Sequence, residues 1–231
     1  MTALSDLTWQ DAGRLRSAIL AVPLGATEQH GPHLPLSTDT DVAVALAGEL
    51  ARRRDDVLVG PAVPYGSSGE HADFPGTLSI GQQALELVLV ELGRSASASF
   101  GRLLFVNGHG GNVEPLRQAV RRLRQEGRDV RTWSPRWRGD AHAGHTETSV
   151  QLALTPGRVR QDLAEAGAVG PLAELLPALR ESGVRAVSAN GVLGDPGGAS
   201  AAVGRALLSE AVEDLVALAV AWPPAVKLSQ P

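Results

Sequence analysis

Residues 17–54 read SAILAVPLGATEQHGPHLPLSTDTDVAVALAGELARRR. An apolar run over residues 17–24 comes first, a polar loop follows up to Asp39, and a segment with helical spacing of apolar residues ends the stretch. This order is typical of a strand that leads through a loop into a helix. The alternation recurs along the chain and predicts the α/β class, with a mainly parallel sheet flanked by helices. We expect a single three-layer domain over residues 1–231, because this length suits one sizeable core.

The expected elements follow from the same reading of apolar runs and amphipathic segments. The predicted strands are Ser17–Leu24, Asp56–Val63, Arg102–Asn107 and Asp129–Ser134. The predicted helices are Asp41–Arg54, Gln82–Ser97, Val113–Gln125, Thr148–Leu154 and Val203–Ala221. Gly191–Gly198 has the composition of a turn, and we assign it no chemistry.

The composition narrows the function. Hydrophobic residues make up 43% of the chain and charged residues 20%, as in ordinary globular proteins. The net charge of −4 and the lack of a basic surface pattern argue against a nucleic-acid partner. A polar N-terminus and the lack of an apolar run of roughly 18 residues argue against a membrane and favour a cytoplasmic protein. Because the chain has no cysteine, a metal site would need His, Asp and Glu.

The histidines are confined to four polar loops, residues 25–39, 65–77, 108–112 and 140–147. A single histidine is more often structural or solvated than functional, but here each loop also brings a carboxylate or several glycines. Imidazole with carboxylate is the ligand set of zinc, iron and manganese when thiolates are absent. The six residues are His30, His33, His71, His109, His142 and His145.

The first loop carries Glu28 and His30, which would face the same way in an extended segment and reach one metal pair. Asp39 precedes the next predicted helix, so capping that helix competes with coordination, although Ser37 or Thr38 could cap instead. The last loop also has a simpler interpretation, a solvated helix start capped by Thr146 or Thr148.

These motifs resemble those of the creatininase family, metal-dependent amidohydrolases that open creatinine or hydrolyse formamides, lactams and related amides. The resemblance rests on Glu28–Pro35 with Thr38-Asp39, Phe74–Thr77, Asn107–Asn112 and His142–Ser149. It implies two divalent metal ions, Fe²⁺ or Zn²⁺ or both with Mn²⁺ as an alternative. Glu28 would bind one ion and His30 the other, with Asp39 bridging and His109 beside Glu28.

One position departs from creatininase itself, which has a further Glu two residues after the third-motif His. Gly111 stands there, so the second ion needs another ligand, and Glu147 is our candidate. The resemblance assigns proton transfer to His142, with His145 as the alternative. We expect Glu70 and His71 to contact the substrate.

Within the family, residues 68–77, 93–96 and 140–149 are most similar to the branch of peptidases of mycofactocin biosynthesis. This similarity implies a modified precursor peptide as the substrate partner, cleaved before its C-terminal Val-Tyr unit. A small amide of the creatinine or formamide type is the alternative substrate, and a non-catalytic metal-binding α/β protein is the second alternative. The resemblance also implies a homo-oligomer.

Overall fold

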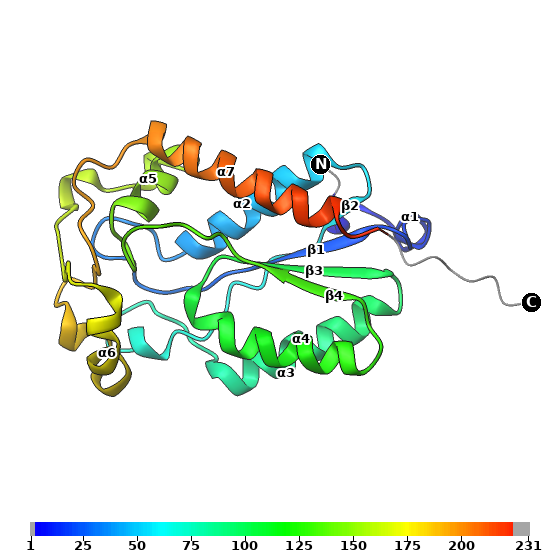
Figure 1. Cartoon of the computed structure of the whole chain (residues 1–231), viewed down its shortest axis with the longest axis horizontal. Coiled ribbons are helices and arrows are strands. Elements are labelled where there is room, and N and C mark those ends of the chain that lie inside the picture. Colours follow the sequence, from blue (N-terminus) through cyan, green and yellow to red (C-terminus); the bar gives the residue numbers. More distant parts are fainter. Residues whose placement is uncertain (1–2, 224–231) are drawn as a thin grey trace, which may run out of the picture.

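The computed structural model describes residues 3–223 of the chain. Its centre is a sheet of four parallel strands in the order β2-β1-β3-β4 (Figure 1). The strands are β1 (Ile19–Leu24), β2 (Val57–Val59), β3 (Arg102–Asn107) and β4 (Val130–Trp133). β1 and β3 are buried along their full length, as expected for central strands covered on both faces. The prediction of the α/β class with a parallel sheet is therefore confirmed.

Helices cover both faces of the sheet and make three layers (Figure 1). The short α1 (Trp9–Gly13) precedes the sheet. The longer helices are α2 (Thr38–Arg53), α3 (Gly81–Ser97), α4 (Val113–Gln125), α5 (His145–Leu154), α6 (Leu172–Val187) and α7 (Ala201–Val220). None of the helices within residues 3–223 is both long and apolar enough to cross a membrane.

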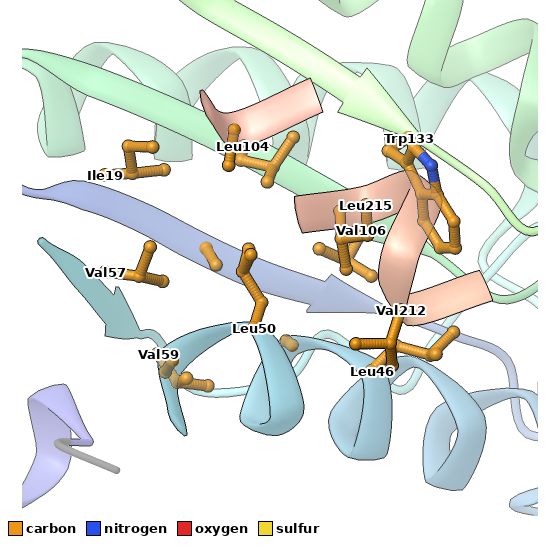
Figure 2. Packing of buried hydrophobic residues seen from close by; sticks show 14 of the residues in the cluster. Ile19, Leu46, Leu50, Val57, Val59, Leu104, Val106, Trp133, Val212 and Leu215 are labelled. Atoms are coloured by element: carbon orange, nitrogen blue, oxygen red, sulfur yellow. The ribbon is translucent and has the colours of Figure 1, made fainter. Parts of the chain in front are cut away.

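Two apolar cores lie on opposite faces of the sheet because successive strand side chains alternate. Ile19 and Leu104 pack with α2 and α7 in one core, where Leu50 and Leu215 contact them (Figure 2). Leu20 and Phe105, one residue along each strand, pack with α3 and α4 in the other core. The sheet is thus held from both sides, and the carboxyl ends of its strands are fixed relative to one another.

Several elements differ from the sequence prediction: α1 was not predicted, and α2 and α5 each begin three residues earlier than expected, at Thr38 and His145. β2 ends at Val59 instead of Val63, because Gly60-Pro61 interrupts the ladder and Pro61 has no N–H to donate. Pairing with β1 resumes only as an isolated bridge between Leu24 and Val63. Helix α6 was not predicted, since Pro177 and Gly183 lie inside it and the backbone at Gly183 has a φ of 73°.

Close packing of α7 on α5 fixes the helix that carries Glu147. A β-carbon on Gly204 of α7 would overlap the backbone carbonyl of Ser149 in α5. In an ordinary helix interior, Ala is more stable than Gly by about 1 kcal/mol. Here we expect Gly204→Ala to lower the free energy of unfolding by about 1–3 kcal/mol instead, because the two helices must move apart.

Urea unfolding checks this prediction through a lower midpoint at an unchanged slope. Ser209→Ala, at an exposed position of the same helix, is the control and should change stability by less than about 0.5 kcal/mol. A gain in stability in Gly204→Ala would contradict the packing described above.

Candidate metal centre and active-site cavity

Buried carboxylates and imidazoles gather at the carboxyl edge of the sheet, where open α/β sheets place their ligands. Glu28 and His30 follow β1, Asp39 lies in the first turn of α2, and His109 follows β3. Glu147 lies in the first turn of α5. Glu28 and His30 have no exposed surface, and Asp39 and His109 are nearly as buried. We call these five residues the acidic cluster.

The acidic cluster divides into two groups that share Asp39. Glu28, Asp39 and His109 have ligand atoms close enough to hold one ion, and so do His30, Asp39 and Glu147. His109 Nδ1 lies 3.1 Å from Asp39 Oδ2, and His30 Nε2 lies 3.2 Å from Asp39 Oδ1. Asp39 therefore presents one carboxylate oxygen to each group, as a bridging ligand would.

The buried carboxylates lack the hydrogen bonds that burial normally requires. Both carboxylate oxygens of Glu28 and Oδ2 of Asp39 have no hydrogen-bond donor among the described residues. An ionised carboxylate without a partner is costly to bury, so these oxygens need a cation. A set of imidazole nitrogens and carboxylate oxygens fits zinc, iron or manganese. The residues present thus fit the two-ion centre that the sequence predicts.

Without a metal ion, protons on the imidazoles and on Glu28 compensate the negative charge of the buried carboxylates. Burial alone would lower the pKa of His30, but the carboxylates of Asp39, Glu147 and Glu28 outweigh burial and raise it to about 10. Burial likewise opposes charge on His109, yet Glu28 and Asp39 raise its pKa to about 10. Burial raises the pKa of Glu28 to about 8, against the opposing effect of His109. A divalent ion would displace these protons from the imidazoles.

Backbone carbonyls orient the two ligand-type histidines. His30 Nδ1 lies 3.1 Å from the backbone oxygen of Glu28 and donates to it, so Nε2 is left for the shared carboxylate. His109 Nε2 donates to the backbone oxygen of Ser67 at 3.0 Å, so Nδ1 is left for Asp39. Such contacts are the usual way in which a protein fixes the tautomer of a metal-binding imidazole.

Glu147 stands where the second group needs a carboxylate. Its Oε2 lies 3.8 Å from His30 Nε2 and accepts a hydrogen bond from the Ala143 backbone at 2.6 Å. Gly111 has no space for a side chain in this arrangement, because a β-carbon there would overlap the Ser67 carbonyl and the His109 ring. Of the two carboxylates in this group, Asp39 comes from α2 and Glu147 from α5.

The remaining histidines take three different positions. His71 and His142 are buried beside Glu28, and burial lowers the pKa of each, that of His71 to about 3. His33 is buried and its Nε2 contacts Thr148 Oγ1 at 2.9 Å. His145 begins α5, but the structure brings it neither into the acidic cluster nor into the wall of the cavity described next.

An open cavity of about 800 Å³ lies above the acidic cluster. Glu28, Asp39, His109 and Glu147 form part of its wall, and Glu70, His71 and His142 line it as well. Helix α6 supplies a further wall with Leu176, Leu179 and Arg180. The residues that we expected to contact the substrate therefore face the same space as the expected metal ligands.

The competing interpretations from helix capping do not describe this structure. Asp39 is the second residue of α2, and neither it nor the N-cap residue Ser37 makes a side-chain capping bond. Helix α5 follows Gly144, and its first backbone N–H, that of His145, donates to the Asp140 carboxylate instead of to Thr146 or Thr148, while Thr148 Oγ1 contacts His33.

Sequence reasoning missed three parts of the site. Gln29 lies between two predicted ligands, yet its side chain contacts His71 and His142. The Gly191–Gly198 turn, to which we assigned no chemistry, exchanges backbone hydrogen bonds with His142 through Leu193. The wall from α6 was missed with the helix itself. The sequence did offer one indication for Gln29. If Glu28 and His30 both reach the metal site, the backbone between them is held in place, and the side chain of residue 29 then has a defined direction as well.

Comparison with known proteins agrees with the geometry. The family model described as creatinine amidohydrolase matches residues 5–219. A protein of Mycobacterium ulcerans (strain Agy99) named "Mycofactocin precursor peptide peptidase" is 54% identical over 215 residues, which cover 89% of this chain and 86% of that protein. A crystal structure of creatinine amidohydrolase superposes with a TM-score of 0.82 at 27% identity and covers 97% of this chain and 99% of its own.

Two further solved creatininases bear on the metal. One, with a TM-score of 0.81, is described as "Creatininase Mn", and a mutant with a TM-score of 0.77 is described as "Zn-Zn type". Fold, buried ligands and cavity together define a metal-dependent hydrolase that acts on amide C–N bonds. The chain belongs to the creatininase family, described as creatinine amidohydrolase.

A bridging carboxylate should matter more for metal binding than any other ligand. We expect Asp39→Ala to lose both ions and Glu147→Ala to lose one, because Asp39 belongs to both groups and Glu147 to one. Metal analysis per protomer after dialysis measures this. His33→Ala and Asp41→Ala are controls that should keep both ions, and full occupancy in Asp39→Ala would contradict the assignment.

Proposed function

We propose that this protein is a two-metal peptidase that hydrolyses the peptide bond before the modified C-terminal Val-Tyr unit of the mycofactocin precursor peptide. The observation that carries the proposal is the 54% identity, over most of both chains, to a relative named for cleavage of that precursor. The aligned region covers 89% of this chain and 86% of that relative, so the similarity is not confined to one part of the fold.

The cavity suits a peptide with a compact modified end. Its volume of about 800 Å³ and its open mouth allow an extended chain to reach the acidic cluster. Leu176, Leu179 and Leu193 give the wall an apolar part that could hold an aromatic group. A creatinine-sized ring would fill only a small part of this space.

The proposed chemistry is addition of water to the amide carbonyl. The acidic cluster would hold a pair of divalent ions, iron or zinc with manganese as the alternative, and these ions would lower the pKa of a bound water and polarise the carbonyl. His142 is placed to move the proton, because its Nδ1 lies 3.8 Å from Glu28 Oε1 at the edge of the cluster. The water oxygen bonds to the carbonyl carbon, the C–N bond breaks, and His142 passes a proton to the departing nitrogen. The products are a carboxylate and an amine.

Two other functions predict different behaviour. A small-amide hydrolase would use the same cluster but would not need the wall from α6. A non-catalytic protein with a structural metal would need closed coordination, whereas Glu28, Asp39, His109 and Glu147 line an open cavity. Assembly as a homo-oligomer stays a prediction from the family.

We expect the enzyme, reconstituted with iron or zinc, to cleave the modified precursor and leave the unmodified precursor largely intact. The cyclised unit should supply the binding energy that orients the scissile amide. Mass spectrometry of both peptides, run beside creatinine and a simple formamide, measures the outcome. Rapid turnover of either small amide, with the modified peptide left intact, would assign the protein to the small-amide branch.

Removing the proton-transfer group should slow catalysis without loss of metal. We expect His142→Ala to lower kcat by about 10²–10⁴-fold while both ions remain bound, because the two groups that share Asp39 supply ligands for two ions without it, even though His142 lies within ligand distance of Glu28 and His30. The matched control is His145→Ala, at a histidine three residues away outside the cavity wall. Loss of one ion in His142→Ala would instead make His142 a ligand.

A further inference from the structure

The side-chain amide of Gln29 lies at the meeting point of two imidazoles and a turn. Its Nε2 is 2.8 Å from His71 Nδ1, 3.0 Å from His142 Nε2 and 3.0 Å from the backbone oxygen of Gly191. Its Oε1 accepts a hydrogen bond from the backbone N–H of Gly31 at 2.9 Å. Gln29 is only 5% exposed, so water cannot replace these contacts.

The backbone partners fix which way the amide points. Gly31 N–H can only donate and the Gly191 carbonyl can only accept, so Oε1 must face Gly31 and the NH₂ must face Gly191. One of the two amide hydrogens therefore goes to the Gly191 carbonyl. The other is available for a single imidazole nitrogen.

The backbone of Gln29 decides which imidazole receives that hydrogen. His142 Nε2 lies 2.8 Å from the backbone oxygen of Gln29, which can only accept. His142 Nε2 therefore carries a hydrogen and donates it, so it cannot accept from the Gln29 amide. The second amide hydrogen goes to His71 Nδ1, which leaves the hydrogen of a neutral His71 ring on Nε2.

The opposite nitrogens of the two rings converge on one atom of the acidic cluster. His71 Nε2 lies 3.5 Å from Glu28 Oε1, and His142 Nδ1 lies 3.8 Å from the same oxygen. The ring centroids are 4.5 Å apart. The site thus receives a hydrogen-bond donor from His71 and an acceptor nitrogen from His142.

We infer that Gln29 is a positioning residue that makes the two imidazoles present opposite hydrogen-bonding characters to the substrate. His71 offers an N–H suited to the oxygen of the scissile carbonyl, and His142 offers an unprotonated nitrogen suited to proton transfer. The side-chain amide of Gln29 determines which nitrogen of His71 carries the hydrogen, and the backbone carbonyl of Gln29 does the same for His142. This assignment of roles rests on the proposed amide hydrolysis, whereas the hydrogen positions do not.

The turn at Gly191 keeps the amide in place. Gly191 has a φ of +81°, and a β-carbon there would overlap the Gln29 side chain. The following residues hold His142, because Leu193 N–H donates to the His142 carbonyl at 2.9 Å. One short turn thus positions both Gln29 and its partner ring.

The hydrogen positions can be read by ¹⁵N NMR of protein labelled at histidine, in the zinc-loaded and metal-free forms. In the wild type we expect His71 Nδ1 to have the shift of an unprotonated ring nitrogen and Nε2 that of a protonated one. The His71 signals are assigned by their loss in His71→Asn. A protonated His71 Nδ1 in the wild type would overturn the inference, whatever the substrate proves to be.

Gln29→Glu tests the cause of this arrangement. It places an oxygen that can only accept beside His71 Nδ1, so that nitrogen should become protonated. We also expect kcat to fall by about 10–100-fold with metal content and KM little changed, as for other residues that orient active groups. The matched control is Gln83→Glu on the exposed side of α3, which should alter neither the spectrum nor kcat.

Gln29→Leu is the second variant and removes the hydrogen bond without adding an acceptor. We expect it to lower kcat in the same range while His71 Nδ1 stays unprotonated, which separates loss of orientation from reversal of the tautomer. Unchanged ¹⁵N shifts in a folded Gln29→Glu protein, or full kcat in Gln29→Leu, would show that Gln29 does not set the roles of the two rings.

Discussion

The burial of two carboxylates without hydrogen-bond donors governs the rest of this site. Glu28 and Asp39 are almost inaccessible, yet three of their four oxygens have no donor among residues 3–223. Such groups need either protons or a cation to compensate them, and the surrounding protein presents the imidazoles of His30 and His109 at fixed distances from them. The parallel sheet makes this possible, because β1 and β3 are paired in register over six residues and end side by side. Their following loops are then held at one edge by cores on both faces.

The sequence predicted the elements whose signals are local and missed those that depend on tertiary contacts. β1 and β3 have near-continuous apolar runs, and α3 and α4 have clear helical spacing, so their positions agree with the prediction. Helix α6 contains Pro177 and Gly183, which disfavour a helix in isolation. Its stability comes from Leu179 and Val184, which pack against Leu193 in a separate small core. No short stretch of sequence predicts this core, because Leu193 lies outside α6 and meets Leu179 and Val184 only in the folded chain.

The candidate ligands were accessible to sequence reasoning for a different reason. All six histidines lie in four short loops that also carry carboxylates or several glycines, and this concentration is visible without knowledge of the fold. What the sequence left open was the choice between neighbours. His142 and His145 are equivalent by composition, but only His142 lies in the cavity wall, because Leu193 pairs with its backbone. Glutamine is not a typical metal ligand or proton-transfer group, and the contacts of Gln29 with His71 and His142 arise only in the folded protein.

Gly111, where creatininase has a Glu, bears on which residue completes the second candidate metal group. In this chain the loop after β3 packs so closely on Ser67 and His109 that residue 111 has no space for a carboxylate. Glu147 supplies the negative charge from α5, and its hydrogen bond from the Ala143 backbone orients it toward His30. Because α5 begins three residues after His142, the same short segment carries both the candidate ligand Glu147 and the proposed proton-transfer group His142. Gly110 and Gly111 still line the cavity, so this side of its wall consists of backbone that carries no side chain.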